Sequence, residues 1–108
     1  MQSYLLQVAY TAEAWKALVK DPQNRIDKVR PVVEKLGGKM QHSWFAFGDY
    51  DIVAILEMPD NISAAAFSLA ASAGGSIRTI KTTALLSMEE GVEAMRKAGK
   101  SGYKPVKS

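Results

Sequence analysis

The order of the strand-like and helix-like segments constrains the fold of this chain more than any other feature. Residues 3–10, 39–47, 50–58 and 76–86 are short, apolar and rich in β-branched or aromatic side chains, which predicts four β-strands. Apolar residues at helical spacing follow the first, third and fourth of these segments. The predicted order is therefore strand, helix, strand, strand, helix, strand, with one more helix at the C-terminus.

Few topologies accommodate that order. Strands joined through a helix make right-handed crossovers, which bring the connecting helices to the same side of the sheet. We therefore predict an α+β, ferredoxin-like βαββαβ domain whose four-stranded antiparallel sheet has the order 4-1-3-2. The helices lie on one face of this sheet, and the C-terminal helix is an addition to the motif.

Local signals set the expected bounds of the helices. Thr11, Asp60 and Ser87 are predicted N-caps, and Glu90 completes a capping box with Ser87. The pair at 21–22, Asp-Pro, predicts the start of the second helix. Glycine pairs at 37–38 and 74–75 predict helix ends, and the Gly-Asp pair at 48–49 predicts a tight hairpin turn with a positive φ at the glycine.

Charge is distributed unevenly along the chain. Residues 96–108 carry five basic side chains and no acidic one, whereas residues 1–95 carry nine basic and eleven acidic ones. We therefore assign residues 1–98 to a single domain and residues 99–108, which include two glycines and a proline, to a basic flexible tail. The acidic body and the absence of an aromatic side chain from the central strand at 52–58 argue against a nucleic-acid-binding sheet.

Alternation divides the strand side chains between two faces. The face under the helices is predicted to carry Tyr4, Leu6, Val8, Phe45, Phe47, Ile52, Ala54, Leu56, Ile80 and Ala84. The opposite face, called the open face below, is predicted to carry Leu5, Gln7, Met40, His42, Trp44, Val53, Ile55, Glu57, Thr79, Lys81 and Thr83. An apolar surface of this extent is typical of an interaction site, since burial stabilises by about 25 cal/mol per Å². We expect two copies to pair through it as a dimeric α/β barrel, or as a higher oligomer built from such dimers.

Four polar side chains interrupt the open face: Gln7, His42, Glu57 and Lys81. Buried without partners, such groups would each cost about 1–3 kcal/mol, so they must pair, meet water or meet a ligand. Glu57 and Lys81 are expected to form an ion pair across the sheet, and Lys81 could instead hold an anion. Trp44 lies two residues from His42 and shares its face. We predict a pocket here for a small, partly apolar molecule.

His42 is the single histidine of the chain, and no cysteine is present, so we predict neither a metal site nor a cofactor. Two interpretations of His42 remain open. It is a packing or interface residue, or it is a general base, because an imidazole exchanges a proton near neutral pH.

The second hairpin carries a recognisable pattern. Residues 45–53, Phe-Ala-Phe-Gly-Asp-Tyr-Asp-Ile-Val, resemble the GYD domain family, with Asp49 inserted into the signature as Gly48-x-Tyr50-Asp51. The similarity extends to residues 33–38, 59–60, 78–79 and 102–105, and thus over nearly the whole chain. It implies a ferredoxin-like dimeric α/β barrel. Similar folds include cofactor-free monooxygenases, isomerases and ligand-sensing domains, so the resemblance does not select a chemistry.

The signature residues have a structural and a functional interpretation. In the structural one, Gly48 makes the turn, Tyr50 packs its ring at the start of the strand, and Asp51 accepts backbone N–H bonds around the hairpin. In the functional one, Tyr50 and Asp51 lie at the rim of a ligand pocket.

Two functions are consistent with these features. We predict a small-molecule-binding homo-oligomer, either a sensor or an accessory protein, with Gln7, Trp44, Glu57, Lys81, Tyr50 and Asp51 as candidate ligand contacts. The alternative is a cofactor-independent monooxygenase- or isomerase-like enzyme with His42 as its general base. The chain has no apolar run of about 18 residues and no signal-peptide pattern, which predicts a cytoplasmic protein without a membrane partner.

Overall fold

The centre of the sheet is the antiparallel pair β1 (Gln2–Tyr10) and β3 (Ile52–Met58) in the computed structural model, which describes residues 1–107. β2 (Lys39–Phe45) pairs with β3, and β4 (Ile77–Leu85) pairs with β1, both antiparallel. The order β2-β3-β1-β4 is the predicted order 4-1-3-2 counted from the other edge. The prediction of an α+β, ferredoxin-like sheet is therefore confirmed.

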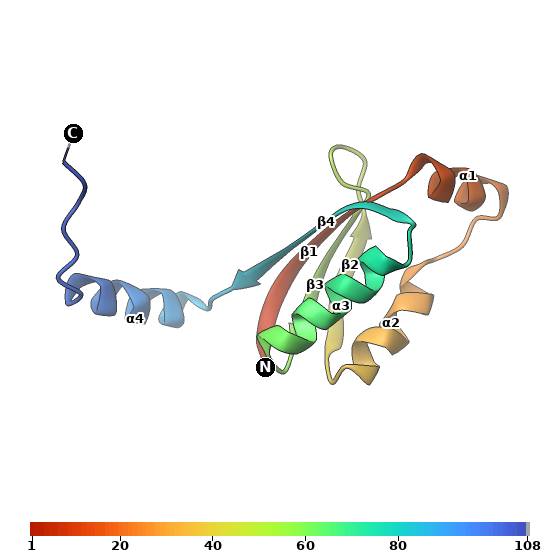
Figure 1. The fold of residues 1–108 in the computed structure, drawn as a ribbon. Coiled ribbons are helices and arrows are strands. Elements are labelled where there is room, and N and C mark those ends of the chain that lie inside the picture. Colours follow the sequence, from red (N-terminus) through yellow and green to blue (C-terminus); the bar gives the residue numbers. More distant parts are fainter. Residues whose placement is uncertain (108) are drawn as a thin grey trace.

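Four helices accompany the sheet: α1 (Ala12–Lys20), α2 (Ile26–Lys35), α3 (Asn61–Ala73) and α4 (Met88–Gly99). Figure 1 shows α2 and α3 side by side on one face, α1 beyond the end of the sheet, and α4 projecting away from it. Side chains of the three predicted N-caps, Thr11, Asp60 and Ser87, accept the expected backbone N–H bonds. The second helix begins at Ile26 and not at residue 22, because residue 21 ends α1.

The core lies between α2, α3 and the face of the sheet that they cover. The alternate residues of β1 and β3 that point to this side are each at most 5% exposed: Tyr4, Leu6, Val8, Ile52, Ala54 and Leu56. Val33 of α2 and Phe67 of α3 pack onto them as buried members of the same cluster. The helices thus bury one phase of each central strand and leave the other phase uncovered.

A β-bulge in β2 puts Met40 on the opposite side of the sheet from the predicted one. Met40 opposes Leu56 and His42 opposes Ile55, so Gln41 is an extra residue between two consecutive pairs. Met40 was expected on the open face but is buried with the core at 3% exposure. The bulge restores the predicted phase beyond it, because an extra residue moves all the following side chains to the other face.

The loop between β2 and β3 is longer than predicted. It spans residues 46–51, and Ala46 N donates to the Asp51 carbonyl oxygen across its base at 2.8 Å. The glycines with positive φ among the described residues are Gly37, Gly75 and Gly102, so the tight turn with positive φ expected at Gly48 is wrong. A loop of this length reverses the chain without a left-handed residue at that position. Phe47, expected under the helices, is fully exposed in this loop.

The molecule is more extended than a chain of its length requires. Its radius of gyration is 17.3 Å, and its longest extent is 57 Å, whereas a compact domain of this size has a radius of gyration of about 13 Å. The difference comes from α4, which contains no buried residue and lies apart from the body in Figure 1.

The predicted tail leads to a test. Residues 100–107 lie beyond the last helix and are exposed, and residue 108 lies outside the described residues. Because this segment buries no apolar side chain, we expect deletion of residues 100–108 to change the melting temperature by less than about 2 °C. Differential scanning calorimetry measures the change, and a fall of more than a few degrees would show that the tail packs on the protein.

Candidate functional site

His42 and Trp44 form a stacked pair on the open face. Both belong to the edge strand β2, where His42 opposes Ile55 and Trp44 opposes Val53. Their ring centroids are 5.8 Å apart with an interplanar angle of 19°, and Trp44 is 55% exposed. The pair therefore presents a flat apolar ring beside a group that can donate, accept or exchange a proton.

The floor of the open face is apolar and only half-buried. Leu5, Val53 and Ile55 of the central strands lie next to one another in register, with Gln7 opposite Val53. Neither α2 nor α3 covers these side chains, because Figure 1 shows both helices on the other side of the sheet. Water contact of this surface is unfavourable at about 25 cal/mol per Å² of apolar area.

The predicted polar residues do not converge within this chain. Lys81 lies on β4, opposite Gln7, whereas His42 and Trp44 lie on β2 at the other edge. Three strand spacings separate the two edges, which amounts to about 14 Å. A small molecule on Trp44 therefore does not reach Lys81 of the same protomer.

Glu57 has a different partner from the one expected. Its Oε1 accepts a hydrogen bond from Gln41 Nε2 at 2.6 Å. The predicted ion pair with Lys81 is wrong, because Glu57 is in register with Ser3, and Lys81 with Gln7, four residues further along β1. Among the described residues the ion pair present is Arg96–Glu93, on the surface of α4.

Asp51 ties three elements together at the end of the sheet. One carboxylate oxygen, Oδ2, accepts from the Tyr10 backbone N–H at 2.8 Å and from Trp15 Nε1 at 3.2 Å. The Asp51 backbone N–H donates to the Val8 carbonyl at 2.7 Å. The expected hydrogen bonds to backbone are thus present, but they reach the end of β1 rather than the residue's own hairpin.

Tyr10 and Trp15 complete this cluster. Their rings meet edge to face with centroids 5.5 Å apart. Burial raises the pKa of the Tyr10 hydroxyl, and the nearby Arg25 guanidinium opposes that rise. No spacing signal in the sequence links Trp15 to Asp51, because the two are 36 positions apart.

Tyr50 is half-buried at the rim of a shallow hollow of about 450 Å³. The hollow is lined by Gly48, Asp49, Tyr50, Arg78 and Thr79. Tyr50 thus borders this hollow, whereas the Asp51 carboxylate faces the Tyr10–Trp15 cluster.

Two further properties bear on the kind of site. Within residues 1–107, no group of three or more His, Asp or Glu side chains is arranged to hold a metal ion. None of the helices that the structure describes combines the length and the apolar character needed to cross a membrane.

The sequence model of the GYD domain matches residues 4–95, which include the sheet, the loop with the Gly-x-Tyr-Asp pattern, and most of α4. The chain belongs to the GYD domain family. A search of the curated proteins finds no match to this chain.

The hydrogen bonds of Asp51 give the GYD signature a structural role in this fold. Within this GYD domain, Asp51 precedes β3 directly and fixes the end of β1 and the first turn of α1. A carboxylate that accepts two such bonds holds the loop, the strand end and the helix in one arrangement. The geometry of Asp51 thus accounts for its place in the signature by structure alone.

The role of Asp51 can be tested by stability. Asp51→Ala leaves the Tyr10 N–H and the Trp15 indole N–H without their acceptor, which should lower the free energy of unfolding by roughly 1–3 kcal/mol. Urea unfolding followed by tryptophan fluorescence measures the loss. Asp49→Ala, in the exposed loop next to it, is the matched control and should leave stability unchanged. Equal effects of the two substitutions would contradict the assignment.

Proposed function

We propose that this GYD domain protein is a homodimer that binds a small molecule between the open faces of its two protomers. The observation that carries the proposal is the stacked His42–Trp44 pair on an apolar, half-buried sheet face opposite the one that α2 and α3 cover. Pairing two such faces removes the apolar floor from water and leaves the polar groups to line the space between the sheets.

The separation of the candidate residues supports a site shared by two protomers. A two-fold axis parallel to the strands would set β2 of one protomer over β4 of its partner. His42 and Trp44 would then face Lys81 of the partner subunit, although Lys81 of their own chain lies at the far edge of the sheet. The expected ligand is a small aromatic or carbonyl-bearing compound, with its ring on Trp44 and its polar group at His42.

The pairing of the open faces is tested with a buried charge. Val53→Asp would place an unpaired carboxylate at the centre of the interface, which is costly, and should convert the protein to monomers. Size-exclusion chromatography with light scattering at micromolar concentration measures the mass. Val19→Asp makes the same change on the exposed surface of α1 and should leave the dimer intact. A wild-type protein that is monomeric at this concentration would refute the proposal.

Ligand binding is tested by a thermal-shift screen of small aromatic and carbonyl compounds. For a compound that stabilises the wild type, His42→Ala and Trp44→Ala should each weaken binding by about 1–3 kcal/mol, because each removes one contact. Isothermal titration calorimetry gives the affinities, and Lys35→Ala on the exposed surface of α2 is the control. Affinities unchanged by both substitutions would exclude this site.

An activity assay with the bound compound separates binding from catalysis. Turnover of the bound compound by the wild type, abolished by His42→Ala while the fold is kept, would assign the protein to the cofactor-independent monooxygenase- or isomerase-like enzymes. Stoichiometric binding without turnover would assign it to the sensors and accessory proteins.

A further inference from the structure

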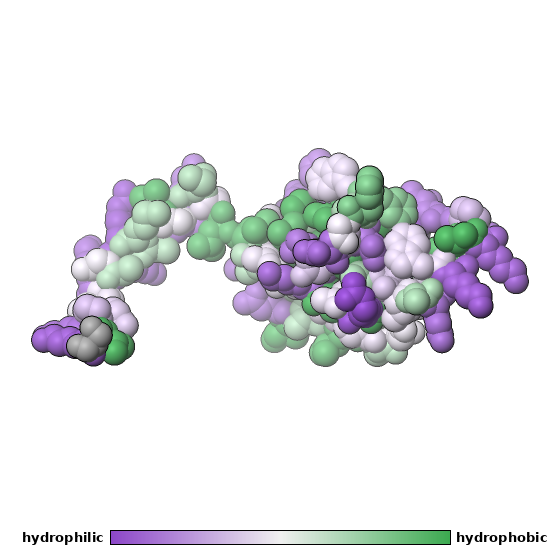
Figure 2. Space-filling model, turned by 90° about the horizontal axis from the view of Figure 1, so that it is seen from above, coloured by the Kyte–Doolittle hydropathy of each residue, from purple (hydrophilic) through white to green (hydrophobic). Residues whose placement is uncertain are grey.

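α4 is a well-formed helix that lies apart from the body of the molecule. Ser87 Oγ accepts from Glu90 N at 3.0 Å, and Glu90 Oε1 accepts from Ser87 N at 2.9 Å, which completes a capping box. Yet none of its 12 residues is buried. Figure 2 shows it as a separate mass joined to the body by a narrow neck. A helix of this length is only marginally stable alone in water, so it requires a surface to pack against.

One side of α4 is apolar. Met88, Val92 and Met95 follow one another at helical spacing and are between 42% and 84% exposed. We call these three residues the arm stripe. Half a turn away, the helix carries Glu90 and Lys97. This pattern is typical of a helix whose apolar side faces a partner.

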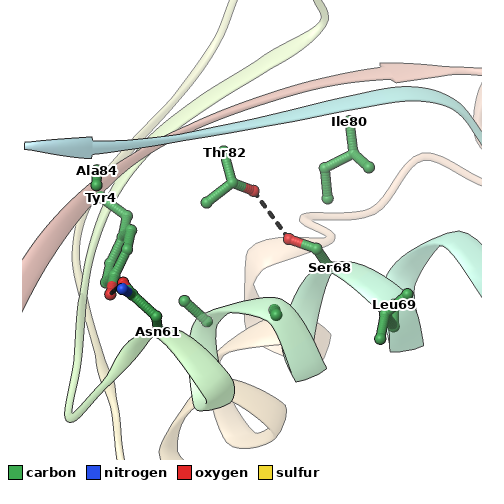
Figure 3. A pocket seen from close by; sticks show the side chains of 9 residues that line it. Tyr4, Asn61, Ser68, Leu69, Ile80, Thr82 and Ala84 are labelled. Carbon is green, nitrogen blue, oxygen red and sulfur yellow. Dashed lines mark hydrogen bonds between the residues drawn. The ribbon is translucent and has the colours of Figure 1, made fainter.

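The body carries an apolar groove beside α3. The α3–β4 groove has a volume of about 520 Å³ and is lined by Tyr4, Asn61, Ala64, Ala65, Ser68, Leu69, Ile80, Thr82 and Ala84. Figure 3 shows β4 side chains on one side of it and the α3 side chains on the other. The hydroxyls of Ser68 and Thr82 hydrogen-bond to each other at 2.8 Å, so they need no polar occupant.

The composition of α3 also indicates a buried environment. None of its 13 residues is charged, although Ile62 is 82% and Leu69 is 70% exposed. Solvated helix surfaces are normally charged or polar, and the polar residues of α3 are one asparagine and three serines. The alanines along the groove leave room for long, flexible side chains such as Met88 and Met95.

In this structure α4 does not line the groove of its own chain. Ser87 and Glu90 border a hollow with Ser3, Ile55 and Leu85, and these three belong to the register positions of the open face. The first turn of α4 therefore lies on the open-face side, whereas the α3–β4 groove lies on the helix-covered side. The sheet separates the arm from its own groove.

We propose that α4 is an exchanged arm, that is, a helix that packs on a second copy of this chain. Its arm stripe docks in the α3–β4 groove of that copy. Reciprocal exchange gives both protomers the same contact and closes a dimer. The inference deepens the homodimer proposed above and rests on it for the rest of the interface. It uses different residues, so each of the two contacts can be tested without the other.

The area that the open-face contact and the two α4 contacts would bury together supports the proposal. Four strands of about seven residues cover about 440 Å², so two paired open faces bury about 900 Å². A 12-residue helix is about 18 Å long and about 10 Å wide, so two arms in two grooves bury about 700 Å² in total. A stable interface needs about 1,200–2,000 Å². Neither contact reaches that value alone, whereas their sum of about 1,600 Å² does.

The absence of cysteine from the chain makes cross-linking a clean test. Met95→Cys protein is mixed with Ile62→Cys or with Leu69→Cys protein and oxidised, and mixed disulfide dimers are measured on non-reducing gels. We expect at least one pair to cross-link at least fivefold more than the same acceptor with Lys97→Cys, whose side chain leaves the opposite side of α4. Cross-linking no greater than in this control would overturn the proposal.

A second measurement covers docking within one chain. A protein with both Met95→Cys and Leu69→Cys is oxidised at nanomolar concentration, and a disulfide formed within single chains would overturn the exchange. Val92→Glu should raise the dimer dissociation constant at least tenfold in analytical ultracentrifugation, whereas Lys97→Gln should not. If instead Val53→Asp disrupts the dimer while Val92→Glu and the cross-linking pairs have no effect, the open-face dimer stands and the arm exchange fails.

Discussion

The antiparallel pairing of β1 with β3 is the constraint on which the rest of the structure depends. Tyr4, Leu6 and Val8 face the helices from one strand, and Ile52, Ala54 and Leu56 face them from the other. Side chains alternate along a strand, so the register that builds this core also decides what the opposite face carries. Leu5, Val53 and Ile55 are the unavoidable complement of the core residues between them. The open face and the core are two results of the same pairing.

The residue that holds the strand ends together and the candidate ligand contacts lie in different parts of this sheet. The Asp51 carboxylate acts at the end of the central strands, where it holds Tyr10 and Trp15 in place. His42 and Trp44 lie on the edge strand β2, where the bulge at Gln41 sets their side. Asp51 of the GYD signature thus holds the loop, the end of β1 and the start of α1 together. The flat ring beside an imidazole is the feature that a ligand could use.

The protomer exposes more apolar surface than its small core explains. The open face, the uncharged helix α3 and the stripe of α4 are three such surfaces. A chain of about 100 residues buries only about two-thirds of its unfolded surface when it folds alone. Surfaces of this kind place part of the stability of a small domain in its association with other chains. The homodimer proposed above, with its exchanged α4, would cover all three surfaces at once.

The strand order, the N-caps at Thr11, Asp60 and Ser87, and the faces of β1 and β3 could all be predicted from the amino-acid sequence. These features depend on chemistry within a few residues: a side-chain oxygen next to a free N–H, or a period of two along a strand. The sequence also placed His42 and Trp44 on one face, because they are two residues apart.

Four features could not be predicted without the folded structure: the side of Met40, the partner of Glu57, the acceptor for the Trp15 indole and the direction of α4. Each of these depends on which residues lie opposite one another after folding. One bulged residue moves Met40 into the core, and a register difference of four residues separates Glu57 from Lys81. The alternation of side chains along a strand can be predicted from the sequence. Register and bulges cannot, because they arise from pairing between segments that are distant along the chain.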